Sequence, residues 1–358
     1  MRENLYRIPL MLAALVILTM AAWAGLLRLG WQLPTLHPNL NLYHGPLMVP
    51  AFFGTLISLE RAVALGKAWA YPSSILSAIG GLLIAFGVNH RIGPLLITLG
   101  SFWLVLMFIV VLRRHFAGYT LIMAIGALAL VGGNLLWLIG WSVSRFVVWW
   151  TAFLILTITG ERLELSRLVK TSLLQKNIFN LVTAFYLTGL VALLFSWQLG
   201  VRMTSAGILA FALWLLRNDI ARRTIYQAGL TRFIAISMLI GYVWLAISGI
   251  IGLVYGAYPA GPVYDAMLHA VFVGFVFGMI FAHAPIIFPS ILGFEITYRP
   301  AFYYSLIILH LSLILRIGGD MLGWEWARLW GGMFNEVAVF SYFVLITPIK
   351  AVNQKRRS

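Results

Sequence analysis

Two histidines of this chain, His44 and His269, have the setting expected of paired metal ligands. Each lies near the start of a long apolar segment, in the sequences N-L-Y-H-G-P and Y-D-A-M-L-H-A-V. If both segments cross a membrane in the same direction, the two imidazoles lie at one depth. Two neutral imidazoles on opposite sides of a haem can supply both axial nitrogens of its iron. A hydrogen bond to a nearby carbonyl explains either histidine alone; the pair predicts a haem b.

Asp265 and Arg145 are the predicted supporting residues of this site. Asp265 lies four residues before His269, so both side chains share one helix face. Its carboxylate could accept the second ring N–H of His269, a common way of fixing a ligand's tautomer. Arg145 is expected at the same depth on a third helix, where it is suited to neutralise haem propionates.

A second group of polar residues is predicted near the opposite ends of the same helices. It comprises Glu60, Glu161, His283 and His310. Carboxylates within an apolar span are costly and are usually functional. Two histidines with one or two carboxylates could bind copper or another transition metal, ligate a second haem, or relay protons. The simpler alternative is an ion-paired helix end, because Arg61 and Arg162 directly follow the two glutamates.

A faint internal repeat connects the two groups. T-L-I-S-L-E-R at 55–61 resembles L-T-I-T-G-E-R at 156–162, and His283 takes the corresponding position in a third block. His44 and Arg145 each lie 16 residues before the matching glutamate, and His269 lies 14 before His283. At about 1.5 Å per residue, each pair is separated by roughly 21–24 Å along its helix. The repeat predicts three four-helix units around a pseudo-threefold axis, near 1–112, 118–220 and 232–349.

The composition predicts a single integral membrane domain over residues 1–358. Hydrophobic residues make up 62% of the chain and charged residues 10%. Apolar runs of about 20 residues recur throughout, the length that a membrane-spanning helix needs. We predict an all-α fold with twelve spans in three four-helix arcs, near 8–29, 39–65, 72–89, 93–112, 118–140, 145–165, 178–197, 203–220, 232–256, 263–288, 300–318 and 327–349.

The net charge of +15 is explained by topology. With the amino terminus in the cytoplasm, six of the 25 Lys and Arg residues fall on outer segments, which leaves 19 on cytoplasmic ones. This asymmetry follows the positive-inside rule and predicts that both termini are cytoplasmic, in a bacterial-type inner membrane. The predicted partner is therefore the lipid bilayer and not nucleic acid. The absence of cysteine excludes disulfides, Fe–S clusters and covalent c-type haem.

Twelve helices in three arcs, with histidines toward the outer ends of helices two and ten, resemble the catalytic subunit of the haem–copper oxidase superfamily. The short loops, the size and the histidine on helix two are most similar to NnrS-type membrane proteins, a haem- and copper-containing family linked to nitric oxide metabolism. The resemblance implies that His44 and His269 are the ligands of a low-spin haem.

The chain also departs from the oxidases. It has no histidine from 116 to 268, and helix ten lacks a closely spaced histidine pair, so the usual binuclear oxygen-reducing centre cannot form. The leading hypothesis is a b-type haem protein in electron transfer or nitrogen-oxide chemistry, reduced by a quinol or a small redox substrate. The alternatives are a proton-coupled secondary transporter and an assembly factor for a respiratory complex.

Overall fold

The computed structural model describes residues 4–88, 91–165, 172–293 and 296–347, and the regular structure within these ranges is entirely helical. The helices are α1 (Asn4–Leu29), η1 (Leu40–Tyr43), α2 (His44–Pro46), η2 (Leu47–Phe53), α3 (Gly54–Leu65), η3 (Ala68–Ala70), α4 (Pro72–Ala85), α5 (Ile92–Arg114), α6 (Gly118–Leu138), α7 (Val143–Leu165), α8 (Leu173–Ala192), α9 (Trp197–Asn218), α10 (Ala221–Thr224), α11 (Gly229–Tyr255), α12 (Pro262–His269), η5 (Ala270–Phe277), α13 (Gly278–Leu292), α14 (Phe302–Leu322) and α15 (Glu325–Ile346).

Eleven of the described helical segments are long and apolar enough to cross a membrane. They correspond to eleven of the twelve predicted spans. The remaining prediction, at 178–197, falls on α8, which begins earlier, at Leu173, and ends at Ala192. Its first two turns include Gln175, Lys176 and Asn177, and polar residues of this kind lower the mean hydropathy of a segment.

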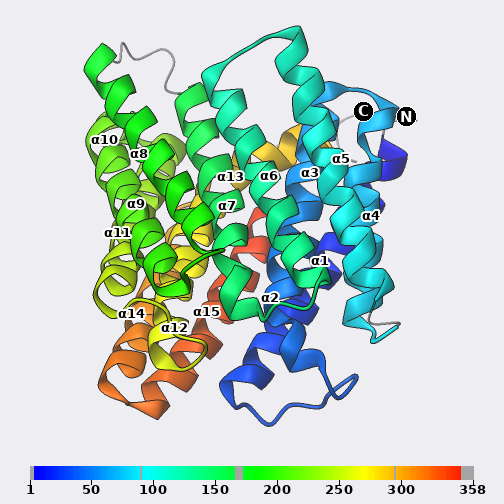
Figure 1. Ribbon diagram of the computed structural model, residues 1–358, viewed down its shortest axis with the longest axis vertical. Coiled ribbons are helices and arrows are strands. Elements are labelled where there is room, and N and C mark those ends of the chain that lie inside the picture. The colour runs from blue at the N-terminus through cyan, green and yellow to red at the C-terminus, as the bar shows by residue number, and fades with distance from the viewer. Residues whose placement is uncertain (1–3, 89–90, 166–171, 294–295, 348–358) are drawn as a thin grey trace, which may run out of the picture.

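Three helical segments form the centre of the bundle. The segments Leu40–Leu65, Val143–Leu165 and Pro262–Ile291 are 67%, 72% and 83% buried over their most apolar stretch, whereas no other candidate span exceeds 56%. These are the helices that carry the faint sequence repeat. They run in the same direction, with α2 and α12 toward one end of the bundle and α3 and α13 toward the other (Figure 1).

The other helices pack around this centre in neighbouring pairs. The closest pairs are α4 with α5, α6 with α7, α8 with α9, α9 with α11, and α14 with α15. Helix α1 contacts both η2 and α15, so the beginning and end of the chain are adjacent in the bundle.

Two of the central helices are not uniform α-helices. A π-helical segment follows each of the predicted haem ligands: η2 begins three residues after His44, and η5 begins directly after His269. Pro50 lies within η2 and has no N–H to donate, which disfavours regular α-helical bonding at that turn. The third central helix, α7, is α-helical throughout. Because π-helical turns often occur at functional sites, these two segments direct attention to the histidines beside them.

Candidate functional site

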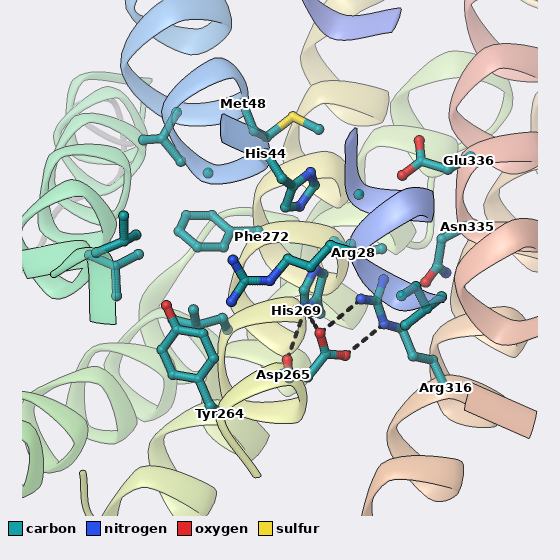
Figure 2. A pocket seen from close by; sticks show the side chains of 18 of the residues that line it. Arg28, His44, Met48, Tyr264, Asp265, His269, Phe272, Arg316, Asn335 and Glu336 are labelled. Carbon is teal, nitrogen blue, oxygen red and sulfur yellow. Dashed lines mark hydrogen bonds and ion pairs between the residues drawn. The ribbon is translucent and has the colours of Figure 1, made fainter. Parts of the chain in front are cut away.

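One cavity lies at the start of the segments Leu40–Leu65 and Pro262–Ile291, and we call it the histidine cavity (Figure 2). Its volume of about 270 Å³ is near the lower end of the range of small-molecule sites, roughly 300–1,000 Å³. The walls combine apolar residues such as Met48 and Phe272 with a concentrated polar set. The charged and polar lining residues are Arg28, His44, Tyr264, Asp265, His269, Arg316, Arg328, Asn335 and Glu336.

The rings of His44 and His269 face this cavity together. Their centroids are 6.1 Å apart and their planes differ by 17°. When two imidazoles ligate one metal ion, each nitrogen lies about 2 Å from the metal and about 1 Å from its own ring centroid, which separates the centroids by about 6 Å. The two rings are therefore spaced for a single shared metal ion. The structure brings the rings of His44 and His269 together, and their ligation of a haem stays a prediction.

Hydrogen bonds select the same tautomer at both histidines. Nδ1 of His44 lies 2.8 Å from the carbonyl oxygen of Ala21, and Nδ1 of His269 lies 2.9 Å from that of Asp265. A carbonyl oxygen can only accept, so each Nδ1 carries the proton and donates it. The lone pair of each Nε2 is left for a ligand, the state that an imidazole needs to bind a metal.

Helix α1 packs against His44 through Gly25. A Cβ atom at position 25 would lie 2.8 Å from Cε1 and Nδ1 of the His44 ring, a distance that real Cβ contacts do not show. The ring thus occupies space that only glycine provides, and its hydrogen bond to Ala21 comes from the same helix. In contrast, Gly274 lies against Trp244 of α11 and serves helix packing.

Asp265 acts on two neighbours at once. Its carboxylate pairs with Arg316 through two hydrogen bonds, Nε to Oδ2 at 2.9 Å and Nη2 to Oδ1 at 3.0 Å. Its Oδ1 also lies 3.3 Å from Nδ1 of His269. The predicted contact between Asp265 and His269 is therefore present, although the backbone carbonyl of Asp265 makes the shorter bond. The bidentate pairing with Arg316 holds the carboxylate beside the ring.

The arginines of the histidine cavity differ from the one predicted from the sequence. Arg145 is exposed and its guanidinium lies 5.6 Å from the ring centre of Trp197, away from the lining of the cavity. Arg316 pairs with Asp265, and Arg328 pairs with Asp320 at 3.1 Å. Arg28, at the end of α1, lines the cavity and has no ion-pair partner among the described residues. It is the cation available to an anionic ligand there.

The predicted second group comes together only in part. Glu60, Glu161 and His283 line one small pocket of about 80 Å³, which we call the glutamate pocket. Arg61 contacts both carboxylates through Nη2, at 2.9 Å from Glu60 and 2.6 Å from Glu161. The expected ion pairing is therefore present, but the arginine of one helix joins the glutamates of two.

His310 lies outside that pocket. Its Nδ1 accepts a hydrogen bond of 3.1 Å from Nε1 of Trp244, and an indole N–H can only donate. His310 therefore carries its own proton on Nε2, which has no lone pair to offer a metal in this state. No group of three or more His, Asp or Glu residues with the geometry of a metal site occurs in the described part of the chain.

Some residues of the histidine cavity had no place in the sequence interpretation. Gly25 was not singled out, and Arg28 and Arg316 were counted only among the six basic residues of the outer segments. The available signal was the presence of arginines at the ends of apolar segments, where a charge is costly unless it has a partner. Which partner each arginine takes depends on the packing of helices far apart in the sequence.

The chain was compared with known proteins. The sequence profile of a family described as a domain of unknown function, DUF8744, matches residues 7–351. The chain belongs to this family. Because the match spans the central helices, the histidine cavity and the glutamate pocket both lie within the DUF8744 region. No curated protein and no solved structure matches the chain.

Proposed function

We propose that this protein is a b-type haem-binding, multi-pass membrane protein that transfers electrons, with His44 and His269 as the axial ligands of one iron. The observation that carries the proposal is the spacing of the two rings, 6.1 Å between centroids, with both Nε2 lone pairs left available by the bonds of Nδ1. The donor set fits the group, since bis-imidazole ligation is a common way of holding haem iron.

The two ligands favour electron transfer over chemistry at the iron. Haem would supply a one-electron couple when bound, and His44 and His269 would hold it through their Nε2 atoms. The backbone hydrogen bonds of both rings, and the packing of α1 against His44 at Gly25, would keep the two histidines in place, so a substrate would have to displace one of them at the cost of these contacts. A lipid-soluble quinol or a small redox substrate remains the predicted donor.

Arg28 is the residue that we assign to the propionates. Haem carries two carboxylates, and guanidinium groups bind carboxylates through short, charge-assisted hydrogen bonds. Arg28 lines the cavity and is exposed, so it lies where the cavity meets the surface. Arg316 and Arg328 are already engaged with Asp265 and Asp320.

The proposal places the protein in a bacterial-type cytoplasmic membrane with twelve spans, α8 included, and with both termini in the cytoplasm. The three most buried segments are those of the sequence repeat, which supports three four-helix arcs around them. Arg167, Lys170 and Lys355 to Arg357, which contribute to the charge asymmetry, lie outside the described residues.

The visible spectrum of the purified protein, expressed with ample haem, tests the proposal. We expect a low-spin b-type spectrum that is lost or converted to a high-spin form in both His44→Ala and His269→Ala. His115→Ala is the matched control, because His115 is an exposed histidine at the end of α5 that contributes to neither pocket. A haem-free protein from haem-replete cells, or unchanged bis-imidazole signals in both variants, would overturn the assignment.

A further inference from the structure

The charges around the glutamate pocket do not balance. Glu60 and Glu161 supply two carboxylates, and Arg61 is the one described cation that contacts them. All three side chains are about four-fifths buried, with exposed fractions of 22%, 16% and 19%. An uncompensated charge in such a place is costly, so the pair should hold one further positive charge.

Two other side chains of this pocket have polar atoms without a partner. Nε2 of His283 and Oγ1 of Thr157 are both buried and make no hydrogen bond in the described structure. The residues are 8% and 2% exposed. Thr151 and Thr159 on the same helix donate to the carbonyl four residues earlier, but Thr157 does not. Oγ1 of Thr157 lies against Gly126 of α6, whereas His283 lines the pocket from α13. Buried polar atoms normally have partners, so the unpartnered Nε2 of His283 points to an occupant of the pocket.

The tautomer of His283 indicates what that occupant offers. Its Nδ1 lies 2.8 Å from the carbonyl oxygen of Met279, so Nδ1 carries the proton and Nε2 is an acceptor. The occupant must therefore donate to Nε2 of His283, and it meets the carboxylates of Glu60 and Glu161 on the other walls. Water satisfies all of these groups, and a pocket of about 80 Å³ is large enough to hold it.

We propose that Glu60 and Glu161 share a single proton at neutral pH, reached through water that is hydrogen bonded to His283. A hydronium ion from bulk water gives its proton to a carboxylate oxygen of the pair, which becomes a carboxylic acid and leaves a water molecule. The remaining carboxylate keeps its pairing with Arg61. This inference rests on the charges of the pocket and the unpartnered Nε2 of His283, and it does not depend on the haem.

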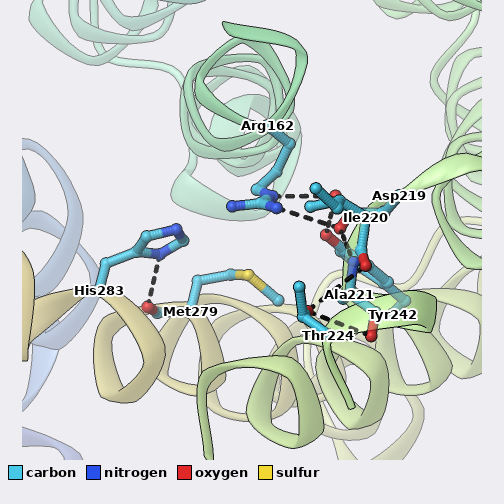
Figure 3. Close-up of polar contacts among 8 residues, drawn as sticks. All are labelled: Arg162, Asp219, Ile220, Ala221, Thr224, Tyr242, Met279 and His283. Atoms are coloured by element: carbon cyan, nitrogen blue, oxygen red, sulfur yellow. Dashed lines mark hydrogen bonds and ion pairs between the residues drawn. The ribbon is translucent and has the colours of Figure 1, made fainter. Parts of the chain in front are cut away.

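The surrounding charges favour a proton on the glutamates over other arrangements. Arg162 lies on the side of the pocket occupied by His283; its Nε and Nη2 pair with Asp219, and the nitrogen without a drawn bond is turned toward the imidazole (Figure 3). A second positive charge on His283 would face this guanidinium. Asp219 is already satisfied by Arg162, Tyr242 and the N–H of Ala221.

A metal cation is disfavoured by the same geometry. The guanidinium of Arg61 lies within 2.9 Å of both carboxylates and would repel another cation at those oxygens. Glu164, the remaining charged residue on the inner turn of α7, lines a separate pocket with Arg61 and adds to the negative charge. A proton needs no coordination shell, and it neutralises one carboxylate where it binds.

Infrared difference spectroscopy of the purified full-length protein at neutral pH tests this inference. A protonated carboxyl group has a C=O band that carboxylates lack, and exchange into D₂O shifts it. We expect Glu60→Gln and Glu161→Gln each to abolish the same band completely, because either change leaves one ionised glutamate for Arg61. Glu325→Gln, at an exposed residue that begins α15, is the matched control and should leave the band intact.

His283→Phe provides a second measurement if a glutamine variant fails to fold. It keeps both glutamates but removes the Nε2 acceptor, so the band should persist at a shifted frequency. Sodium chloride is then titrated against choline chloride at constant ionic strength. The proposal is wrong if both glutamine variants keep every carboxyl band, or if the band disappears as sodium rises, which would identify Na⁺ as the occupant.

Discussion

The histidine cavity and the glutamate pocket use one local device for different purposes. In both, a histidine donates Nδ1–H to a backbone carbonyl, which leaves the lone pair of Nε2 available. His269 and His283 donate to the carbonyl four residues earlier in their own helix. The histidine cavity places a second such imidazole opposite, 6.1 Å away. The glutamate pocket places two carboxylates and an arginine there instead.

This difference shows that the neighbours of Nε2 decide what a buried histidine can do. Two available lone pairs, on rings 6.1 Å apart, and an Arg28 without an ion-pair partner among the described residues suit a metal held in an anionic macrocycle. One lone pair beside an excess negative charge suits water and a proton. Because the two sites lie toward opposite ends of the two helical segments that they share, variants can alter one and leave the other as an internal control.

The largest expected effect is a loss of haem binding when Gly25 is substituted. Gly25 lines the histidine cavity but not the glutamate pocket, so the substitution should affect one site alone. Valine there would drive a methyl-bearing Cβ into the His44 ring, 2.8 Å away, and break its alignment with His269. We expect at least about tenfold weaker haem binding, the range seen when residues that orient a metal ligand are changed. Haem content per protein is measured on the purified variant.

Gly318→Ala is the control for that substitution, because a Cβ at this helical position meets nothing within 4 Å. It should bind haem as the unmodified protein does. The infrared carboxyl band should persist in Gly25→Val, since its site is elsewhere. Full haem binding by Gly25→Val would show that the His44 ring is not held in place by α1.

The next effect is on stability and lies in the glutamate pocket. Arg61→Met leaves two partly buried carboxylates without their shared cation. We expect the free energy of unfolding to fall by about 2 kcal/mol, a value between those for exposed and for fully buried ion pairs. Thermal unfolding in detergent measures it. The haem spectrum of the folded variant should not change.

Adding Glu161→Gln to Arg61→Met should recover part of the loss, because only one carboxylate then lacks a partner. No recovery in the double variant would mean that Arg61 stabilises the bundle through packing and not through charge. That outcome would also weaken the charge count from which the shared proton is inferred.

A smaller effect is expected on the reduction potential of the haem. Comparing Arg28, which lines the histidine cavity, with Arg145, which the sequence repeat predicts there, tests which arginine lies near the haem. Arg28→Gln removes a positive charge from the histidine cavity, which favours the ferric state and lowers the reduction potential. We expect a decrease of roughly 30–60 mV, where about 60 mV corresponds to a tenfold change for one electron. Arg145→Gln should change the potential far less. Equal shifts, or a larger one at Arg145, would favour the position that the repeat predicts.

The sequence was most informative where local pattern and function coincide. Apolar length predicted eleven of the spans, and the spacing of His44 and His269 predicted their approach. The π-helical segments and the cavity arginines were not predicted. Neither feature produces a periodic pattern in the sequence. Tertiary packing decides where a π-helical turn inserts an extra residue, and it decides which rotamer an arginine adopts. Arg145 illustrates this. It lies in the first turn of α7, near the position that the repeat predicts, but its guanidinium lies over the ring of Trp197.

The smallest effect concerns His310, whose position separates it from both sites. His310→Leu leaves the indole N–H of Trp244 without an acceptor in a buried position, at a cost of about 1–2 kcal/mol. His310→Gln keeps an acceptor and should cost less. Thermal unfolding of the two variants measures this difference.

Neither His310 variant should alter the haem spectrum or the infrared carboxyl band. The reason is the tautomer: with Nδ1 accepting from Trp244, Nε2 carries a proton and cannot act as a ligand. A change of the haem spectrum or a loss of bound metal in His310→Gln would show that this histidine gives up its bond to Trp244 in the loaded protein. The second metal or haem predicted from the sequence would then regain its fourth ligand.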